Sequence, residues 1–248
     1  MTSALRIEPI PILSDNYAWL LRDTRDGAVA VVDPADADAV GAVVDRRGGR
    51  LDWVLLTHHH DDHIAGAEAI ARRFGARIAG AAADRHRLPP LDLALSSGDR
   101  VVLGTGADAA EGEVIATPGH TAQHISFFFA DGPALFCGDT LFSLGCGRLL
   151  EGTADEMFAS FRRFDRLPDD TLVCCGHEYT ESNLRFALSV DENNPALRAR
   201  GAAVARQRAA GEPTVPTRLA EERAANPFLR APDAGELARL RRAKDSFR

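Results

Sequence analysis

The chain has 248 residues, of which 45% are hydrophobic and 26% are charged. This length and composition predict a globular protein with a full hydrophobic core and exclude a disordered or fibrous chain. The net charge of −7 argues against binding to nucleic acid. No apolar run is long enough to span a bilayer, and the N-terminus lacks the features of a signal peptide. We therefore expect a cytoplasmic protein with no membrane partner.

Short apolar runs typical of β-strands recur through the first part of the chain, with amphipathic segments between them. Strands are predicted at 6–10, 18–21, 28–32, 53–56, 114–116, 125–129, 134–137 and 171–175. Helices are predicted at 37–46, 64–74 and 155–164. Thr153 and Glu156 stand at the spacing of a capping box at the start of the last helix. This mixture predicts layered sheets flanked by helices rather than a strict βαβ alternation.

After about residue 179 the strand pattern ends and only helical segments follow. Helices are predicted at 181–188, 196–209, 218–224 and 235–244, with prolines in the connections. From Ala196 to the end, 12 Lys and Arg residues stand against 6 Asp and Glu, so this segment is basic while the rest is acidic. The sequence thus predicts an α/β body at 1–177 and a small helical C-terminal domain at 178–248.

A cluster of histidine and aspartate follows the predicted strand 53–56, in the stretch Thr57-His58-His59-His60-Asp61-Asp62-His63. Imidazole and carboxylate groups suit zinc, iron or manganese. His58 and His60 project to the same side of an extended chain, because side-chain direction repeats every two residues. Asp62 and His63 lie where the chain turns into a helix, and they can reach a second centre. Grouping these side chains is costly unless a cation compensates, so the stretch predicts a metal site.

Further candidate ligands follow other predicted strands, each beside a glycine that allows a sharp turn. They are His120, Asp139 and His177. A carboxylate shared between two ions is a natural role for Asp139. An isolated His-x-His pair is usually a surface feature, but one at a strand end with this many neighbours favours a metal site. His59 is expected to face away from the site, and His124 is expected to have a structural role.

These residues resemble the metallo-β-lactamase superfamily, whose signature HxHxDH appears at 58–63 and whose later His, Asp and His positions match the three candidates above. The resemblance implies an α/β fold, a four-layer αββα sandwich with the site at its edge. A narrower resemblance, to the glyoxalase II (hydroxyacylglutathione hydrolase) family, covers nearly the whole chain. Its motifs include Gly145-Cys146-Gly147-Arg148, Gly176-His177-Glu178-Tyr179-Thr180, Asn226-Pro227-Phe228 and the segment 241–245.

The glyoxalase II resemblance implies two divalent metal ions, with zinc expected and iron or manganese as alternatives. The implied ligands of the first ion are His58, His60, His120 and Asp139. The implied ligands of the second ion are Asp62, His63, Asp139 and His177. The family's glutathione-binding positions match Arg148, Tyr179, Arg241 and Lys244. Leu150 stands where the family often has an aromatic residue.

The implied reaction is hydrolysis of S-D-lactoylglutathione, or another S-2-hydroxyacylglutathione, to D-lactate and glutathione, the second step of methylglyoxal detoxification. A hydroxide between the ions would attack the thioester carbonyl, with Asp62 and Asp139 as the catalytic carboxylates. A thiol has a solution pKa of roughly 8.5, so the glutathione thiolate can leave without a general acid. The expected partner is this small molecule, and no obligate protein partner is evident.

Other functions compete with this interpretation. A persulfide dioxygenase of the same superfamily would use a single iron and would not need the second set of ligands. A β-lactamase would give the C-terminal segment no role, and a nuclease is disfavoured by the acidic body and the lack of a nucleic-acid-binding module. A non-catalytic metal-binding protein would bind the ions without turnover. Without the family resemblance, Arg241 and Lys244 would be read as a solvated basic helix face.

Overall fold

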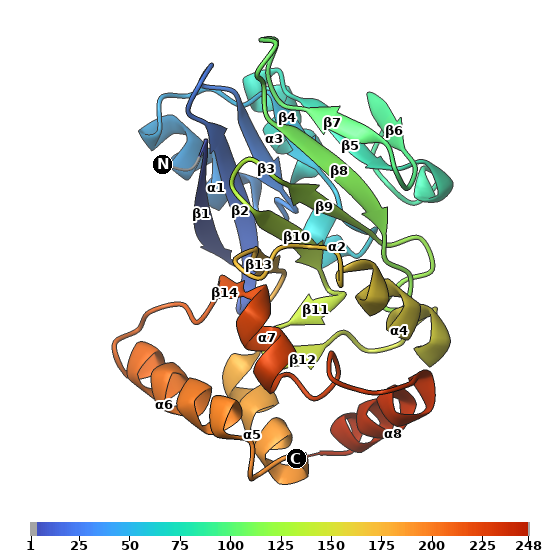
Figure 1. The fold of residues 1–248 in the computed structure, drawn as a ribbon. Coiled ribbons are helices and arrows are strands. Elements are labelled where there is room, and N and C mark those ends of the chain that lie inside the picture. The colour runs from blue at the N-terminus through green and yellow to red at the C-terminus, as the bar shows by residue number, and fades with distance from the viewer. Residues whose placement is uncertain (1–3, 248) are drawn as a thin grey trace.

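The computed structural model describes residues 4–247, and its body is built from two mixed β-sheets flanked by helices (Figure 1). The first sheet follows the order β1 (Leu5–Ile12), β2 (Asn16–Asp23), β3 (Val29–Val32), β4 (Trp53–Leu55), β5 (Arg77–Ala81) and β6 (Leu93–Leu95). β1 to β3 are antiparallel neighbours, whereas β3 to β6 are parallel. The carboxyl ends of β3 and β4 therefore meet at one edge of the sheet.

The second sheet follows the order β14 (Thr217–Arg218), β13 (Leu172–Cys175), β10 (Ala134–Gly138), β9 (Ile125–Phe129), β8 (Glu111–Ala116) and β7 (Arg100–Val102). β10 and β13 are parallel, and the other pairs are antiparallel. Buried aromatic residues join the two sheets: the Trp19 ring lies 6.4 Å from the Phe136 ring, which also packs against Phe129. Burial of this apolar surface is the main stabilising term of the body.

Helices cover the outer faces of both sheets. α1 (Ala37–Arg46) contacts β1, and α3 (Ala67–Phe74) contacts β4 and β5. On the side of the second sheet, α4 (Ala154–Arg163) buries Met157 and Phe161, and its predicted capping box of Thr153 and Glu156 is formed. The predicted fold class, an αββα sandwich followed by a helical C-terminal region, is confirmed.

The C-terminal region consists of α5 (Thr180–Val190), α6 (Pro195–Ala209), α7 (Leu219–Ala225) and α8 (Ala234–Asp245) (Figure 1). α8 packs against α4 of the body. The prediction that no strand follows residue 179 is wrong, because β14 pairs with β13 and extends the second sheet. A strand of two residues is too short to leave a periodic signal. The division of the chain at 177/178 stays a prediction.

One predicted helix is interrupted, and some short strands were not predicted. The helix expected at 64–74 is split into α2 (Asp61–Ile64) and α3, with Gly66 between them. A Cβ atom at Gly66 would overlap the carbonyl oxygen of Pro34, so the chain needs glycine at this close approach. The sequence does not predict β5, β6 and β7, nor the two-residue strands at 141–142 and 145–146. No helix in 4–247 has the length and apolar character needed to cross a membrane.

Candidate metal centre

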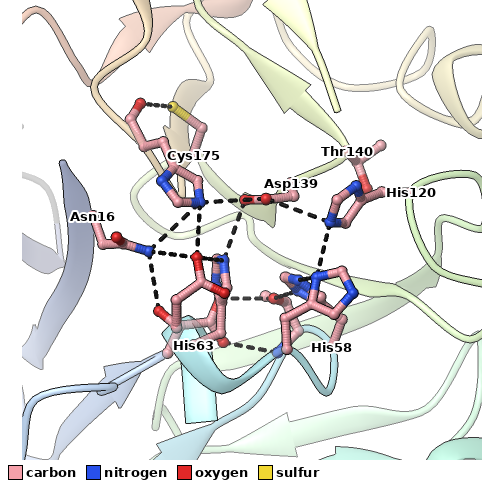
Figure 2. Close-up of polar contacts among 12 residues, drawn as sticks. Asn16, His58, His63, His120, Asp139, Thr140 and Cys175 are labelled. Carbon is pink, nitrogen blue, oxygen red and sulfur yellow. Dashed lines mark hydrogen bonds and ion pairs between the residues drawn. The ribbon is translucent and has the colours of Figure 1, made fainter. Parts of the chain in front are cut away.

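The predicted ligands gather at one edge of the sandwich, because they follow the ends of β4, β8, β10 and β13. Figure 2 shows His58, His63, His120 and Asp139 among them, close together. His58, His60 and His120 form one group, with ligand atoms within 4.8 Å of one another. His60 Nδ1 lies 3.1 Å from His58 Nε2 and 3.0 Å from His120 Nε2. Three ring nitrogens that converge this closely can share a metal ion.

Hydrogen bonds on the outer side of two rings decide which nitrogen faces the centre. His58 Nδ1 lies 3.0 Å from Thr57 Oγ1, and His120 Nδ1 lies 2.8 Å from the carbonyl oxygen of Arg148. With Nδ1 bonded on the outer side, Nε2 of each ring points toward the centre. Ligand histidines are usually oriented by such a bond to the other ring nitrogen. Burial lowers the pKa of His58 well below its usual value and lowers the pKa of His120, which favours the neutral, metal-binding form.

Asp62, His63 and His177 form a second group within the same 4.8 Å limit. His63 Nδ1 lies 3.0 Å from Asp33 Oδ2, and His177 Nδ1 lies 2.9 Å from Asp15 Oδ1. Both rings therefore present Nε2 to the centre, oriented by a carboxylate on their outer side.

Asp33 could be counted as a ligand, since its oxygen lies near His58 and His63. Its oxygens, however, already accept hydrogen bonds from Thr57, at 2.9 Å from the backbone nitrogen and 2.6 Å from Oγ1, and one of them also contacts His63. Asp33 therefore orients the ligands and is itself an unsuitable ligand. On the opposite side, Asn16 Nδ2 donates to Asp62 Oδ2 at 3.1 Å and fixes that carboxylate.

Asp139 lies between the two groups (Figure 2). Its Oδ1 atom lies 3.3 Å from His63 Nε2, and its Oδ2 atom lies 3.5 Å from His120 Nε2 and 3.3 Å from His177 Nε2. This placement suits the predicted role of a carboxylate shared by two ions. His63 Nε2 and Asp139 Oδ1 are both buried, and they contact each other without the geometry of a hydrogen bond within residues 4–247. Buried polar atoms without hydrogen bonds are costly, so this donor set fits divalent cations.

The charges of the site point the same way. Burial would raise the pKa of Asp139, but the neighbouring His63 and His177 hold it well below its usual value, so the carboxylate stays ionised. Burial would lower the pKa of His63, but Asp139 and Asp33 raise it well above its usual value. A buried carboxylate that draws positive charge this strongly favours a metal site.

His124 holds the backbone next to Asp139. The Asp139 N–H group donates to His124 Nε2 at 3.3 Å, and His124 Nδ1 lies 2.9 Å from Thr117 Oγ1. Gly138 has φ of 44°, and a Cβ atom there would lie 2.8 Å from His124 Nε2. The turn that delivers Asp139 therefore needs glycine. His124 has the structural contacts that the sequence predicted for it.

His59 faces away from the centre, as predicted. Its Nδ1 atom lies 2.9 Å from the buried Asp84 carboxylate, which also pairs with Arg87. Arg87 in turn donates to Glu151 at 2.5 Å and lowers the pKa of that carboxyl to about 2. This network ties the metal-binding loop to the segment that follows Arg148.

A cleft of about 260 Å³ begins at His120 and Asp139 and ends at the predicted glutathione-binding residues. Its lining includes Arg148, Tyr179, Arg241 and Lys244, with Phe142, Cys146, Gly147, Ser182 and Asn183. Tyr179 stacks on His177, with ring centroids 4.6 Å apart. Arg241 is only 6% exposed, so this helix face is not simply solvated, and its Nη1 atom donates to the Cys146 carbonyl at 2.8 Å. Cations of the C-terminal region thus lie beside the candidate metal ligands.

Comparison with known proteins shows the family. Residues 13–177 match the family model of the metallo-beta-lactamase superfamily, and residues 178–247 match that of the hydroxyacylglutathione hydrolase C-terminus. The hydroxyacylglutathione hydrolase of Acidiphilium cryptum (strain JF-5) is 59% identical over 241 residues, covering 97% of this chain and 96% of that protein. The chain belongs to the hydroxyacylglutathione hydrolase (glyoxalase II) family. The hydroxyacylglutathione hydrolase of Cereibacter sphaeroides (strain ATCC 17025 / ATH 2.4.3) is 49% identical, covering 98% of this chain and 99% of that protein.

Solved structures agree on the superfamily fold of this glyoxalase II family member. ETHE1 from Myxococcus xanthus superposes with a TM-score of 0.72 at 25% identity, covering 98% of this chain and 92% of that one. TTHA1623, solved in a di-iron-bound form, superposes with a TM-score of 0.58 at 25% identity, covering 68% of this chain and 91% of that one.

The residues that sequence reasoning missed in this glyoxalase II family member lie mostly behind the ligands. Asp33 follows β3 in the way that His58 follows β4, so the strand-end argument could have found it. Asp15 lies in a turn without periodic signal, and its contact with His177 depends on the fold. Ser182 and Asn183 line the cleft from α5, where they resemble ordinary helix-surface residues in sequence.

Proposed function

We propose that this chain hydrolyses S-D-lactoylglutathione, or another S-2-hydroxyacylglutathione, to the hydroxy acid and glutathione. The observation that carries the proposal is a cleft whose lining includes the candidate ligands His120 and Asp139 at one end and the cations Arg148, Arg241 and Lys244 at the other. Glutathione carries two carboxylates, and cations bind carboxylates through strong charge-assisted hydrogen bonds. The similarity over nearly the full chain to named hydroxyacylglutathione hydrolases supports the same reaction.

We propose that the site holds two divalent ions, with zinc first and iron or manganese as alternatives. His58, His60, His120 and Asp139 would hold one ion, and Asp62, His63, Asp139 and His177 would hold the other. When bound, such ions supply Lewis acidity, which activates water near neutral pH and polarises a carbonyl. Ligand type alone does not choose among these metals.

The protein's own residues then have separate roles in the proposed reaction. Asp139 keeps the two groups of ligands at a fixed spacing, and Asp62, fixed by Asn16, orients the attacking water. The C-terminal cations hold the glutathione part and place the thioester carbonyl at the metal end of the cleft. The departing thiolate, with a solution pKa of roughly 8.5, leaves without a proton donor.

The proposed activity is tested by steady-state hydrolysis of S-D-lactoylglutathione with protein of measured metal content. Lactoyl-N-acetylcysteamine, which lacks the glutathione part, serves as the comparison thioester and should be a poor substrate. Oxygen uptake with glutathione persulfide should be absent. No hydrolysis by fully metallated protein would refute the proposal, and oxygen uptake would favour the dioxygenase alternative.

Arg241→Ala should raise the KM for S-D-lactoylglutathione about tenfold and change kcat much less, because one charge-assisted contact with the substrate is lost. The matched control is Arg242→Ala, since Arg242 is the next residue on α8 but is exposed and does not line the cleft. Steady-state kinetics on both variants measures the difference. A fall in kcat alone would contradict the binding role.

The KM should also depend on pH through Lys244. Burial, with Arg241 nearby, lowers the pKa of Lys244 to about 8. Its Nζ atom donates to Ser182 O at 2.9 Å and Oγ at 3.0 Å, which leaves a third N–H for a substrate carboxylate. As pH rises through this pKa the positive charge is lost, so KM should rise several-fold between about pH 7 and about pH 9.

The control for this pH effect is Lys244→Arg, because a guanidinium keeps its charge over the whole range. Its KM should stay nearly flat while kcat follows the wild-type profile. Equal pH profiles of KM in the two proteins would rule out Lys244 as the titrating group.

We also propose that 1–177 forms the catalytic unit and that 178–248 supplies glutathione-binding residues. The placement of Arg241 and Lys244 on α8 supports this division. We propose a cytoplasmic location.

A further inference from the structure

A short hairpin links the candidate metal centre to the substrate cleft. Its strands are β11 (Leu141–Phe142) and β12 (Gly145–Cys146). Asp139 lies just before the hairpin, and Arg148 lies just after it. The Arg148 carbonyl oxygen contacts His120 Nδ1 at 2.8 Å, so a shift of the hairpin would move both a ligand and the support of another ligand.

The turn of this hairpin needs support from outside. Leu144 has φ of 58°, a left-handed conformation that is unfavourable for a leucine. A two-stranded hairpin is marginally stable by itself. Figure 1 shows α7, from the C-terminal region, next to β11 and β12.

Asn226, the residue that ends α7, binds both strands of the hairpin. Its side chain is fully buried, and Nδ2 donates to the carbonyl oxygens of Phe142 and Gly145, each at 3.0 Å. Its Oδ1 atom accepts from the Phe228 backbone nitrogen at 3.0 Å. One amide side chain therefore fixes the hairpin and its own turn together.

Glu222, one turn earlier on α7, binds the turn of the hairpin. Its fully buried carboxyl group accepts from the Leu144 backbone nitrogen at 2.8 Å, from Thr217 Oγ1 at 2.8 Å and from Asn226 Nδ2 at 3.1 Å. Burial raises the pKa of this carboxyl group. Burying a carboxyl group costs free energy. The bonds of Glu222 to the hairpin and to Thr217 and Asn226 therefore indicate a positioning role for this residue.

We infer that Asn226 and Glu222 are positioning residues of the active site, which hold Arg148 and the support of His120 in place through the hairpin. This inference rests on the proposed function for its kinetic readout, but its metal-binding readout is independent of turnover. The C-terminal region then builds the metal site as well as binding the substrate.

The first test compares two identical changes, Asn226→Asp and Asn194→Asp. Each variant keeps the oxygen that accepts backbone N–H groups and loses the amide donor. Asn194 caps α6 and donates to the Ala224 carbonyl oxygen, but it makes no bond to the hairpin. The readouts are thermal stability, KM and kcat for S-D-lactoylglutathione, and the affinity of metal-free protein for Zn²⁺.

Asn226→Asp should raise KM and weaken Zn²⁺ binding, each about tenfold or more, as loss of supports behind metal ligands does. Asn194→Asp should change both less than about twofold, because its lost bonds go to Asp191 and to the end of α7 and none of them goes to the hairpin. A folded Asn226→Asp protein with wild-type KM and Zn²⁺ affinity would overturn the inference, and so would equal losses in both variants. If wild-type protein lacks turnover, the proposed function fails while the Zn²⁺ comparison still decides this inference.

The second test uses Glu222. Glu222→Gln keeps one acceptor oxygen for Leu144, and its amide can donate to the Thr217 hydroxyl, so KM and Zn²⁺ affinity should stay within about threefold of wild type. Glu222→Ala should raise KM and weaken Zn²⁺ binding as much as Asn226→Asp does. If a variant does not fold, hydrogen exchange of the wild-type protein provides the test instead. The backbone amides of 141–147 and 219–226 should then exchange at a common opening rate, and independent opening of the two segments would contradict the inference.

Discussion

Replacing Asp139 with asparagine should lower hydrolysis of S-D-lactoylglutathione about a thousandfold or more, because several kcal/mol of transition-state stabilisation are lost with the metals. The carboxylate faces His63 through one oxygen and His120 and His177 through the other. An asparagine keeps the shape but loses the charge, and its amide group can no longer act as a ligand on one side. Bound zinc should fall below two ions per chain.

The measurement for Asp139→Asn is metal content by elemental analysis beside steady-state kinetics on the same sample. Asp131→Asn is the control, because Asp131 is an exposed carboxylate that pairs with Arg25. It should keep wild-type metal content and turnover. An Asp139→Asn protein with two ions per chain and normal kcat would show that this carboxylate is not shared between the ions.

Gly176→Ala should reduce turnover about a hundredfold or more through displaced ligands, because a shift near 1 Å at a catalytic site has effects of this size. A Cβ atom at Gly176 would lie 2.5 Å from Asp139 Oδ1 and 2.6 Å from His63 Cε1. Gly176 does not have a positive φ, so alanine can adopt the backbone there. The defect would therefore come from lost space at the metal site and not from backbone strain.

The control for Gly176→Ala is Gly106→Ala, where a Cβ atom would meet only the Asp108 nitrogen at 4.0 Å. Circular dichroism and thermal unfolding would show that both variants fold. Zinc binding by Gly176→Ala should weaken in parallel with its activity. Wild-type zinc affinity and activity in a folded Gly176→Ala protein would contradict this expectation, because they would mean that the metal site tolerates an added methyl group.

The sequence predicts those parts of the molecule where one local signal suffices. His58 and His60 follow a strong apolar strand, and strand alternation alone places them on one side. The strands before His120, Asp139 and His177 also show clear apolar runs, so candidate ligands at strand ends could be proposed before the fold was known. The helices of the C-terminal region could be predicted from their helix-forming residues and proline boundaries.

Features that depend on contacts between distant segments could not be predicted in this way. Glu222 looks like an exposed acid in the first turn of a helix, yet it is fully buried against a hairpin that lies far away in sequence. Asp15 and Asp33 orient His177 and His63, but nothing in the local pattern pairs these residues. β14 gains its structure from pairing with β13, because two residues carry no periodic signal.

The most direct test is a zinc titration of chelator-treated, metal-free protein, in which bound zinc and hydrolysis of S-D-lactoylglutathione are measured at each step. Two ions shared through Asp139 predict that metal-free protein is inactive and that turnover reaches its maximum as bound zinc reaches two ions per chain. Iron or manganese should restore activity with the same stoichiometry if the site accepts them. Turnover by metal-free protein, or full turnover with a single ion, would contradict the dinuclear account.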